Sequence, residues 1–282
     1  DSSYPCEYEV NYADGGSSSG ILVRDWVHLI FRNGSWVSPW IAFGCGYPSK
    51  GEVPIHQPIN DGVLGLGKGA QGILKQLRDI GVIRNVVGHC LSTQGGGYLF
   101  FGDIPLPGIA WKQILHDAFS EHYFLGSADI LLNGEVTDIR DLGIMFDSGS
   151  TYTYLHSEAY GALLDLVIKN LNGTLKDAAD DNTLPVCWGG PFGSLDEAAS
   201  HFLPLAFNFT DAKNVHFQMD PKSYLIISGK GNVYLGILNG TEVGLEDMNL
   251  IGDISMHDKL VIYDNENGMV GWATVETCNL MF

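Results

Sequence analysis

The sequence predicts a mainly β protein with a few short helices, and three observations support this fold class. Gly accounts for 36 of the 282 residues, and short Val, Ile, Tyr and Phe runs alternate with Gly, Asn, Asp and Pro. The composition is 45% apolar and 17% charged, which is typical of a globular chain and argues against long disordered tracts. Apolar spacing typical of a helix occurs at 73–79 and at 158–171.

The first half of the chain reads as short strands separated by turn-forming pairs such as Asp-Gly and Asn-Gly. The candidates lie at 8–12, 20–23, 26–31, 40–45, 86–91 and 98–101. The helix at 73–79 is expected to stop at Gly81. The stretch 103–108 holds two prolines and a terminal glycine, so it marks the expected boundary between residues 1–107 and residues 108–282.

The second half combines strands with the clearer of the two helices. Its strand candidates lie at 111–115, 123–125, 130–132, 142–146, 260–264 and 270–273. The helix at 158–171 is expected to begin at Ser157, which can cap it, and to end at Gly173. Its apolar stripe consists of Leu163, Leu164, Val167, Ile168 and Leu171.

Charge and hydropathy exclude two classes of partner. Asp and Glu outnumber Lys and Arg by 33 to 15, a formal charge of −18, so the surface repels nucleic acid and anionic membranes. No apolar run reaches the roughly 18 residues that a membrane span requires, so we expect none. So acidic a chain repels itself least at low pH, where carboxylates are protonated, which is compatible with an acidic compartment.

Cysteines and glycosylation sequons point to the secretory pathway, with the extracellular apoplast or the vacuole as destination. The five cysteines are widely spaced and form none of the close pairs of a zinc site, so we expect disulfides. The odd number leaves one without an internal partner, and Cys6 is the expected one. Four sequons make a glycoprotein the expectation, at Asn33, Asn172, Asn208 and Asn239.

The most informative segment is IMFDSGSTYTYL at 144–155. An apolar strand leads into Asp147-Ser148-Gly149, and β-branched and aromatic residues follow. An aspartate there is partly desolvated, which raises a carboxyl pKa, while nearby hydroxyls and backbone N–H groups favour the charged form. Taken alone, the tripeptide is more simply an ordinary turn, because Asp and Ser favour turn starts and Gly tolerates positive φ.

A second pattern changes that interpretation. Two apolar residues followed by Gly occur at Val63-Leu64-Gly65 and again at Leu250-Ile251-Gly252. Together with the Asp-Ser-Gly loop, these segments resemble the pepsin-like aspartic endopeptidases, in which each lobe crosses such a loop with an apolar-apolar-Gly strand. The segment YADGGSSSGILVRD resembles the flap hairpin of that family, which places Tyr12 at the flap tyrosine. FGCGY, GHCLST and LPVCW resemble the plant branch and its nucellin-like proteins.

The resemblance implies a bilobal, double β-barrel fold and a monomeric aspartic endopeptidase that needs no cofactor and no metal. It makes Asp147 a catalytic aspartate, with Ser148, Gly149 and Ser150 forming its loop, and Tyr12 a cover over an extended polypeptide substrate. In this family two close aspartates share one proton and activate a water molecule at acidic pH. We pair Cys45 with Cys90 and leave Cys187 and Cys278 open.

The chain departs from the family in its first lobe, which contains no Asp-Thr/Ser-Gly. In the family that loop precedes the flap by several dozen residues, whereas eleven residues precede Tyr12 here. We therefore expect the first aspartate before residue 1, an incomplete first lobe and a chain that is inactive and folds poorly alone. Asp14-Gly15-Gly16-Ser17 is a poor substitute because no apolar run precedes it, so Asp14 is interpreted as a flap turn residue.

Four alternatives have less support. One is a non-catalytic binding or inhibitor protein on the protease fold, in which the absence of the first aspartate would be genuine. Two chains could each supply Asp147, but the two-lobed pattern within one chain argues against this. The Gly-x-Ser-x-Gly match at 16–20 would need a helix after Ser18, where a return strand is expected instead. The Gly-x-Gly-x-x-Gly match at 67–72 lacks the acidic residue of a dinucleotide site.

Overall fold

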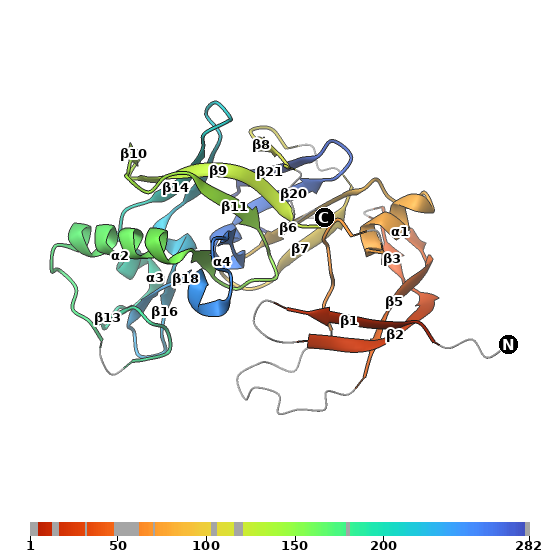
Figure 1. The fold of residues 1–282 in the computed structure, drawn as a ribbon, viewed down its shortest axis with the longest axis horizontal. Coiled ribbons are helices and arrows are strands. Elements are labelled where there is room, and N and C mark those ends of the chain that lie inside the picture. Colours follow the sequence, from red (N-terminus) through yellow and green to blue (C-terminus); the bar gives the residue numbers. More distant parts are fainter. Residues whose placement is uncertain are drawn as a thin grey trace. The chain divides into compact units, whose positions relative to one another are not determined.

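The computed structural model describes eight stretches of the chain, namely 5–12, 17–31, 33–47, 62–69, 71–102, 106–115, 121–178 and 181–279. Two compact units are present: Asp1–Val87 with Phe101–Asp103, and Gly88–Phe100 with Ile104–Phe282. Strands dominate both of them (Figure 1). Among the described residues no helix is both long and apolar enough to cross a membrane. The lobe boundary expected near residue 107 stays a prediction.

The first unit is built on a three-stranded antiparallel sheet of order β1-β2-β5. Its elements are β1 (Glu7–Asn11), β2 (Ser17–Trp26), β5 (Trp40–Gly46), a hairpin of β3 (Leu29–Ile30) and β4 (Trp36–Val37), and α1 (Ile73–Asp79). The helix has the predicted bounds, and Gln76 fixes it to β5. Its side chain accepts from the Ala42 N–H at 2.8 Å and donates to the Ala42 carbonyl at 2.9 Å. Ser18 lies on β2 opposite Val10, so the predicted return strand is confirmed.

This sheet and the β3–β4 hairpin leave large apolar side chains exposed. Ile30, Trp36 and Trp26 are 80%, 69% and 58% exposed, and the residues of β1 are half-buried or exposed throughout. Within the described residues, the buried apolar side chains of this unit are Ile41, Leu74, Leu77, Val86 and Val87. Because a small sheet needs one covered apolar face for stability, the first unit has little core of its own in the described part of the chain.

The second unit contains a large mixed sheet of order β15-β14-β9-β11-β19-β12-β18, to which β10 adds beside β9. The strands are β9 (Tyr123–Leu132), β10 (Glu135–Val136), β11 (Leu142–Phe146), β12 (Thr153–Leu155), β14 (Leu205–Phe209), β15 (His216–Met219), β18 (Ile237–Asn239) and β19 (Asn249–Ile251). β9 runs as one strand where the sequence suggested two, and Gly126 within it has φ +88°. The pairing of β11 with β9 shifts register between Ile144 and Met145, which is a β-bulge.

An aromatic cluster fills the core of this unit. Trp272 packs against Phe146, Phe209 and Phe217 with ring centroids 5.5–5.7 Å apart. Its indole N–H donates to the His216 carbonyl at 2.9 Å, which satisfies the polar end of a buried ring. These residues come from four strands, so the cluster fixes how β11 lies against its neighbours.

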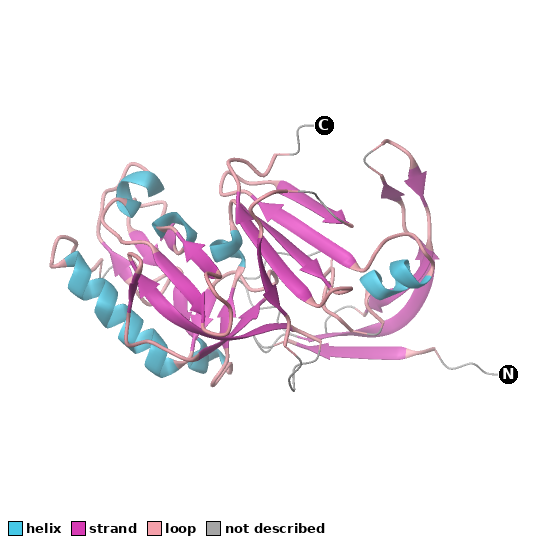
Figure 2. Ribbon diagram, turned by 90° about the horizontal axis from the view of Figure 1, so that it is seen from above, coloured by secondary structure: helices cyan, strands magenta, loops and turns pink. Residues whose placement is uncertain are grey.

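A further sheet has five strands in the order β7-β6-β20-β21-β8. Its strands are β6 (Val86–Leu91), β7 (Gly97–Phe101), β8 (Ala110–Gln113), β20 (Lys259–Asp264) and β21 (Met269–Thr274). Most of them lie within a few residues of their predicted bounds. A small sheet holds β13 (Cys187–Trp188), β17 (Val233–Leu235) and β16 (Leu225–Ile227). Short helical segments are α3 (Leu195–Ala199), α4 (Asp253–Met256), η1 (Pro221–Ser223) and η2 (Gly240–Val243). Figure 2 shows strands, in magenta, predominating over the few helices, in cyan.

Helix α2 (Ser157–Leu171) confirms the predicted helix but corrects its details. Its buried stripe is Ala159, Leu163, Val167 and Leu171, while Ile168 is 49% exposed, so the apolar face is narrower than expected. The helix begins at Ser157, so His156 occupies the N-cap position, and the Ser157 hydroxyl accepts from the Asn239 amide at 3.1 Å. The helix ends at Asn172 in the left-handed conformation, one residue before Gly173.

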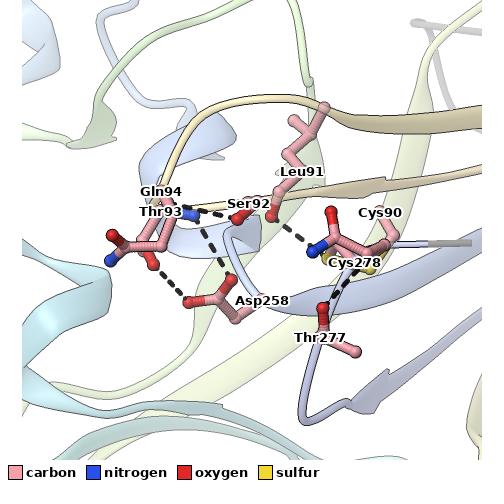
Figure 3. The surroundings of a disulfide bond; sticks show 9 residues. Cys90, Leu91, Ser92, Thr93, Gln94, Asp258, Thr277 and Cys278 are labelled. Atoms are coloured by element: carbon pink, nitrogen blue, oxygen red, sulfur yellow. Dashed lines mark hydrogen bonds between the residues drawn. A yellow bond between two sulfur atoms is a disulfide. The ribbon is translucent and has the colours of Figure 1, made fainter.

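The disulfide joins Cys90 to Cys278, so the expected Cys45–Cys90 pair is wrong (Figure 3). Cys45 is exposed on β5 of the first unit and has no disulfide partner in the described residues, whereas Cys90 lies in the second unit. The bridge spans 188 residues and ties β6 to the segment that follows β21. Nearby, the Asp258 carboxylate accepts from the Thr93 hydroxyl at 2.7 Å, and the Asp258 N–H donates to the Leu91 carbonyl at 2.7 Å.

The unequal cores predict unequal local stability. Amide hydrogen exchange in the chain should be at least about tenfold faster in β1 and β2 than in β9, β11 and β14, because exchange follows local opening and the first unit buries little apolar surface. Exchange mass spectrometry at peptide resolution would measure this. Equal protection of the two groups of strands would contradict it.

Candidate active site

Asp147 stands at the end of a buried central strand. The apolar residues of β11, which are Leu142, Ile144, Met145 and Phe146, are all buried. They run parallel to β19, with Phe146 opposite Ile251, and the Asp147 N–H continues this ladder to the Ile251 carbonyl at 3.1 Å. The sheet therefore delivers a half-buried carboxylate to the point where its two central strands separate.

The loop that follows orients both oxygens of this carboxylate. The Gly149 N–H donates to Oδ1 at 2.9 Å, and the Ser150 hydroxyl donates to Oδ2 at 2.9 Å. The Ser150 N–H also closes the turn to the Asp147 carbonyl at 3.2 Å. Because both bonds come from groups within three residues, the short loop itself fixes the carboxylate, and charge-assisted bonds of this kind are strong. Asp147, Gly149 and Ser150 are thus brought together as the sequence suggested.

Gly252 explains why an apolar-apolar-Gly strand accompanies the loop. A Cβ at this position would lie 2.0 Å from the Tyr152 carbonyl oxygen and 2.7 Å from the Ser150 carbonyl oxygen. Immediately beyond the crossing, the Asp253 N–H donates to the Ser150 carbonyl at 2.7 Å, and the Ile254 N–H donates to the Thr151 carbonyl at 3.2 Å. Only a residue without a side chain allows the two backbones to approach this closely.

A buried hydroxyl network supports the crossing from below. The Thr153 hydroxyl accepts from the Gly252 N–H at 3.2 Å and hydrogen-bonds to the Ser255 hydroxyl at 2.7 Å. Ser255 in turn donates to the Ser223 carbonyl at 3.0 Å, and Lys259 donates to the Ser223 hydroxyl at 3.1 Å. Burial lowers the pKa of Lys259 to about 8. The network therefore satisfies buried polar groups on four elements around the loop.

The equivalent motif of the first unit lies in different surroundings. Val63 and Leu64 are 69% and 53% exposed and belong to no strand, whereas Leu250 and Ile251 are buried in β19. Asp147-Ser148-Gly149 is the one Asp-Thr/Ser-Gly in the sequence. Tyr12 is 39% exposed and follows β1, and residues 13–16, including Asp14, lie outside the described residues. The assignment of Tyr12 to a flap stays a prediction.

Residues distant in sequence contribute to the floor behind the loop, and sequence reasoning missed them. Tyr263 of β20 is buried, and its hydroxyl donates to Met256 Sδ at 3.8 Å and lies 3.4 Å from His89 Nε2. Burial, then Tyr123 and then the charge of Asp147 raise the pKa of Tyr263 well above its ordinary value. Tyr123, whose pKa burial raises to about 12, packs on this ring at 4.2 Å between centroids. The strand signal at 260–264 gave no hint of this contact.

A cavity of about 350 Å³ opens beside Tyr152, five residues after Asp147. Asp181, which is 7% exposed, accepts hydrogen bonds from the Tyr234 hydroxyl and, at 2.8 Å, from the Asn232 amide. These bonds hold the pKa of Asp181 below its usual range. The other lining residues are mostly apolar or small, namely Thr183, Leu184, Ile226, Ile227, Ser228, Gly229 and Lys230.

Comparison of the sequence with known proteins identifies the family of this chain. Two family models match, Xylanase inhibitor N-terminal over residues 1–103 and Xylanase inhibitor C-terminal over residues 122–274. Over 286 aligned residues the chain is 38% identical to aspartic proteinase Asp1 of Oryza sativa subsp. japonica, covering 96% of this chain and 68% of that protein. The chain belongs to the plant pepsin-like aspartic proteinase family. Aspartic proteinase 36 of Arabidopsis thaliana is 26% identical, over 95% of this chain and 57% of that protein.

Solved structures confirm the expected pepsin-like fold class for this family member. The crystal structure of basic 7S globulin from soybean matches with a TM-score of 0.77 at 16% identity, over 100% of this chain and 79% of that one. Conglutin gamma, a basic 7S globulin from lupine seeds, matches with a TM-score of 0.77 at 17% identity, over 98% of this chain and 76% of that one. At such identities the likeness concerns the fold alone. The nucellin-like branch stays a prediction.

The close crossing at Gly252 predicts a large effect of one methyl group. Gly252→Ala should lower the free energy of unfolding by on the order of 3–5 kcal/mol, because its Cβ would meet backbone oxygens that cannot move aside. Denaturant unfolding followed by circular dichroism measures the change. Gly161→Ala in α2 is the matched control, since a Cβ there meets nothing within 4 Å and should stabilise the helix by up to about 1 kcal/mol. Similar losses in both variants would contradict the prediction.

The burial of His89 predicts that the protein loses stability in acid. The side chain is 3% exposed, and burial lowers its pKa from 6.5 to about 4. The unfolded chain therefore takes up this proton at higher pH than the folded chain, so stability present above pH 6.5 is lost as the pH falls towards 4. Between these pH values the protonation of His89 should lower the free energy of unfolding by on the order of 3 kcal/mol, and His89→Phe should remove this loss. Unfolding curves at several pH values test this, with exposed His201→Phe as the control.

Proposed function

We propose that the protein is an aspartic endopeptidase and that Asp147 is one of its two catalytic aspartates. The observation that supports this most directly is the carboxylate at the Gly252 crossing, with Oδ1 and Oδ2 each bonded by its own loop at 2.9 Å. In this chemistry two carboxylates share one proton. One takes a proton from a bound water molecule, which attacks the peptide carbonyl carbon, while the other donates a proton to the carbonyl oxygen.

Asp147 alone cannot perform both roles. As a single acid it is either protonated or ionised, whereas the reaction needs a proton donor and a proton acceptor on opposite sides of the substrate carbonyl. That the first catalytic aspartate lies in sequence before residue 1 stays a prediction. The proposed activity is accordingly that of the complete protein, since the relatives named above are longer than this chain.

The proposed substrate is an extended polypeptide. The cavity beside Tyr152 offers a mostly apolar wall within a few residues of the catalytic loop, so it suits an apolar side chain of the substrate. An acidic working pH follows from the need for one protonated carboxyl in the pair. We further propose a secreted or vacuolar location, which the disulfide and the four sequons support.

Asp147→Asn in the complete protein tests the assignment. It should lower kcat for cleavage of unfolded casein by at least about 10²–10⁴-fold at acidic pH, because an amide can neither accept nor donate the required proton. Exposed Asp165→Asn on α2 is the matched control and should retain activity. Cleavage that persists in Asp147→Asn would overturn the proposal.

A non-catalytic binding protein is the second candidate. The observation that favours it is the match to the two family models described as xylanase inhibitor domains. The same preparation distinguishes the two functions. Under the binding hypothesis the protein inhibits a xylanase, cleaves no casein at any pH, and behaves identically with Asp147→Asn. The intact Asp-Ser-Gly loop and its hydrogen bonds favour the peptidase, because binding at another surface requires neither.

A further inference from the structure

One glycosylation sequon, Asn-Gly-Thr, occurs twice in the second unit. It stands at 172–174, directly after helix α2, and at 239–241, where strand β18 ends. The tripeptides are identical, so the sequence alone makes Asn172 and Asn239 equally good acceptors of a glycan. The structure gives the two copies very different surroundings.

The first copy lies on the surface just beyond α2, the green helix in Figure 1. Asn172, Gly173 and Thr174 are all exposed, and a Cβ added to Gly173 would meet nothing within 4 Å. Among the described residues the Asn172 side chain has no hydrogen-bond partner. Its amide nitrogen is therefore accessible and has open space beside it.

The turn that carries Asn172 is fixed by its neighbours. Leu171, the preceding residue, is 4% exposed and belongs to the buried stripe of α2. The N–H and the hydroxyl of Thr174 both donate to the Leu171 carbonyl, at 2.9 Å and 2.7 Å. Asn172 itself has the left-handed backbone conformation, which asparagine adopts more readily than most residues. The turn thus keeps its shape without using the Asn172 side chain.

The second copy is built into the fold. Asn239 pairs with Leu155 in the ladder of β18 and β12. Its Nδ2 donates to the Ser157 hydroxyl at 3.1 Å and to the Glu242 carboxylate at 3.0 Å. Gly240 is buried, and a Cβ there would lie 3.3 Å from the Leu155 carbonyl oxygen. Both amide hydrogens of Asn239 are therefore in use, and little space remains beside them.

We propose that Asn172 carries an N-linked oligosaccharide in the complete protein and that Asn239 does not. The modification forms a bond between Asn172 Nδ2 and the anomeric carbon of a lipid-linked oligosaccharide diphosphate. The bond from that carbon to the diphosphate oxygen breaks, the lipid diphosphate leaves, and Nδ2 loses one proton. The same step at Asn239 would remove one of the two hydrogens that it donates and place a bulky group beside β12. The inference rests on the proposed secreted or vacuolar location, because sequons are modified in secreted proteins.

Glycan occupancy at the two positions of one molecule tests the proposal. The complete protein is produced in plant cells behind an added secretory leader and then digested. A peptide N-glycosidase in water enriched in heavy oxygen converts each occupied asparagine to labelled aspartate, which mass spectrometry counts. Occupancy should be at least about fivefold higher at Asn172 than at Asn239. Thr174→Ala, which keeps Asn172 and removes the sequon, is the control and should abolish the label there.

The outcomes separate this inference from the proposed function. Equal occupancy at the two asparagines, or a glycan on Asn239 alone, overturns it, because the fold then does not distinguish the two copies. An unmodified Asn172 in protein recovered from the medium also overturns it. Protein that stays in the cytosol without the added leader overturns the proposed location and, with it, the natural glycan. Casein cleavage by Asp147→Asn overturns the peptidase alone, because the glycan does not depend on Asp147.

Discussion

The close passage of two backbone segments at Gly252 is the constraint on which the candidate site depends. Segments about 100 residues apart in sequence approach so closely that a single methyl group would lie 2.0 Å from a carbonyl oxygen. Hydrogen bonds on both sides of the crossing, from Asp147 to Ile251 and from Asp253 to Ser150, fix its register. The carboxylate owes its position to this passage, because β11 and β19 diverge where the crossing begins.

The surrounding packing protects the crossing from distortion. Phe146, one residue before the aspartate, packs against Phe217 at 5.0 Å and against Trp272 at 5.5 Å. On the polar side, buried Lys259 has no ion pair in the described residues and instead lies 5.4 Å over the Phe217 ring. Its burial is costly, yet it donates to the Ser223 hydroxyl, while the Ser223 carbonyl accepts from Ser255 in the network that reaches the Gly252 N–H through Thr153. Apolar and polar layers thus hold the same short segment.

Local patterns in the sequence predicted local structure well. Apolar spacing gave the bounds of α1, and the Asp-Ser-Gly tripeptide with its apolar strand indicated the loop around Asp147. Features that depend on distant partners were not predictable in this way. The Cys90–Cys278 bridge spans 188 residues, and Tyr263 lies 116 positions after Asp147, so neither leaves a signal within a short window. Ser157 is not the cap because the helix already begins there, and its hydroxyl accepts from the distant Asn239 amide.

The two apolar-apolar-Gly segments show how far a motif can be trusted. Leu250-Ile251-Gly252 forms a buried strand because β11 and β12 lie on either side of it. Val63-Leu64-Gly65 has the same pattern but is exposed and in no strand. Strand propensity is largely a matter of packing against neighbours, so the same short pattern forms a strand at 249–251 and none at 63–65. The hydrogen bonds that orient Asp147 all come from residues of the second unit. Its carboxylate is therefore fixed without any contribution from the first unit.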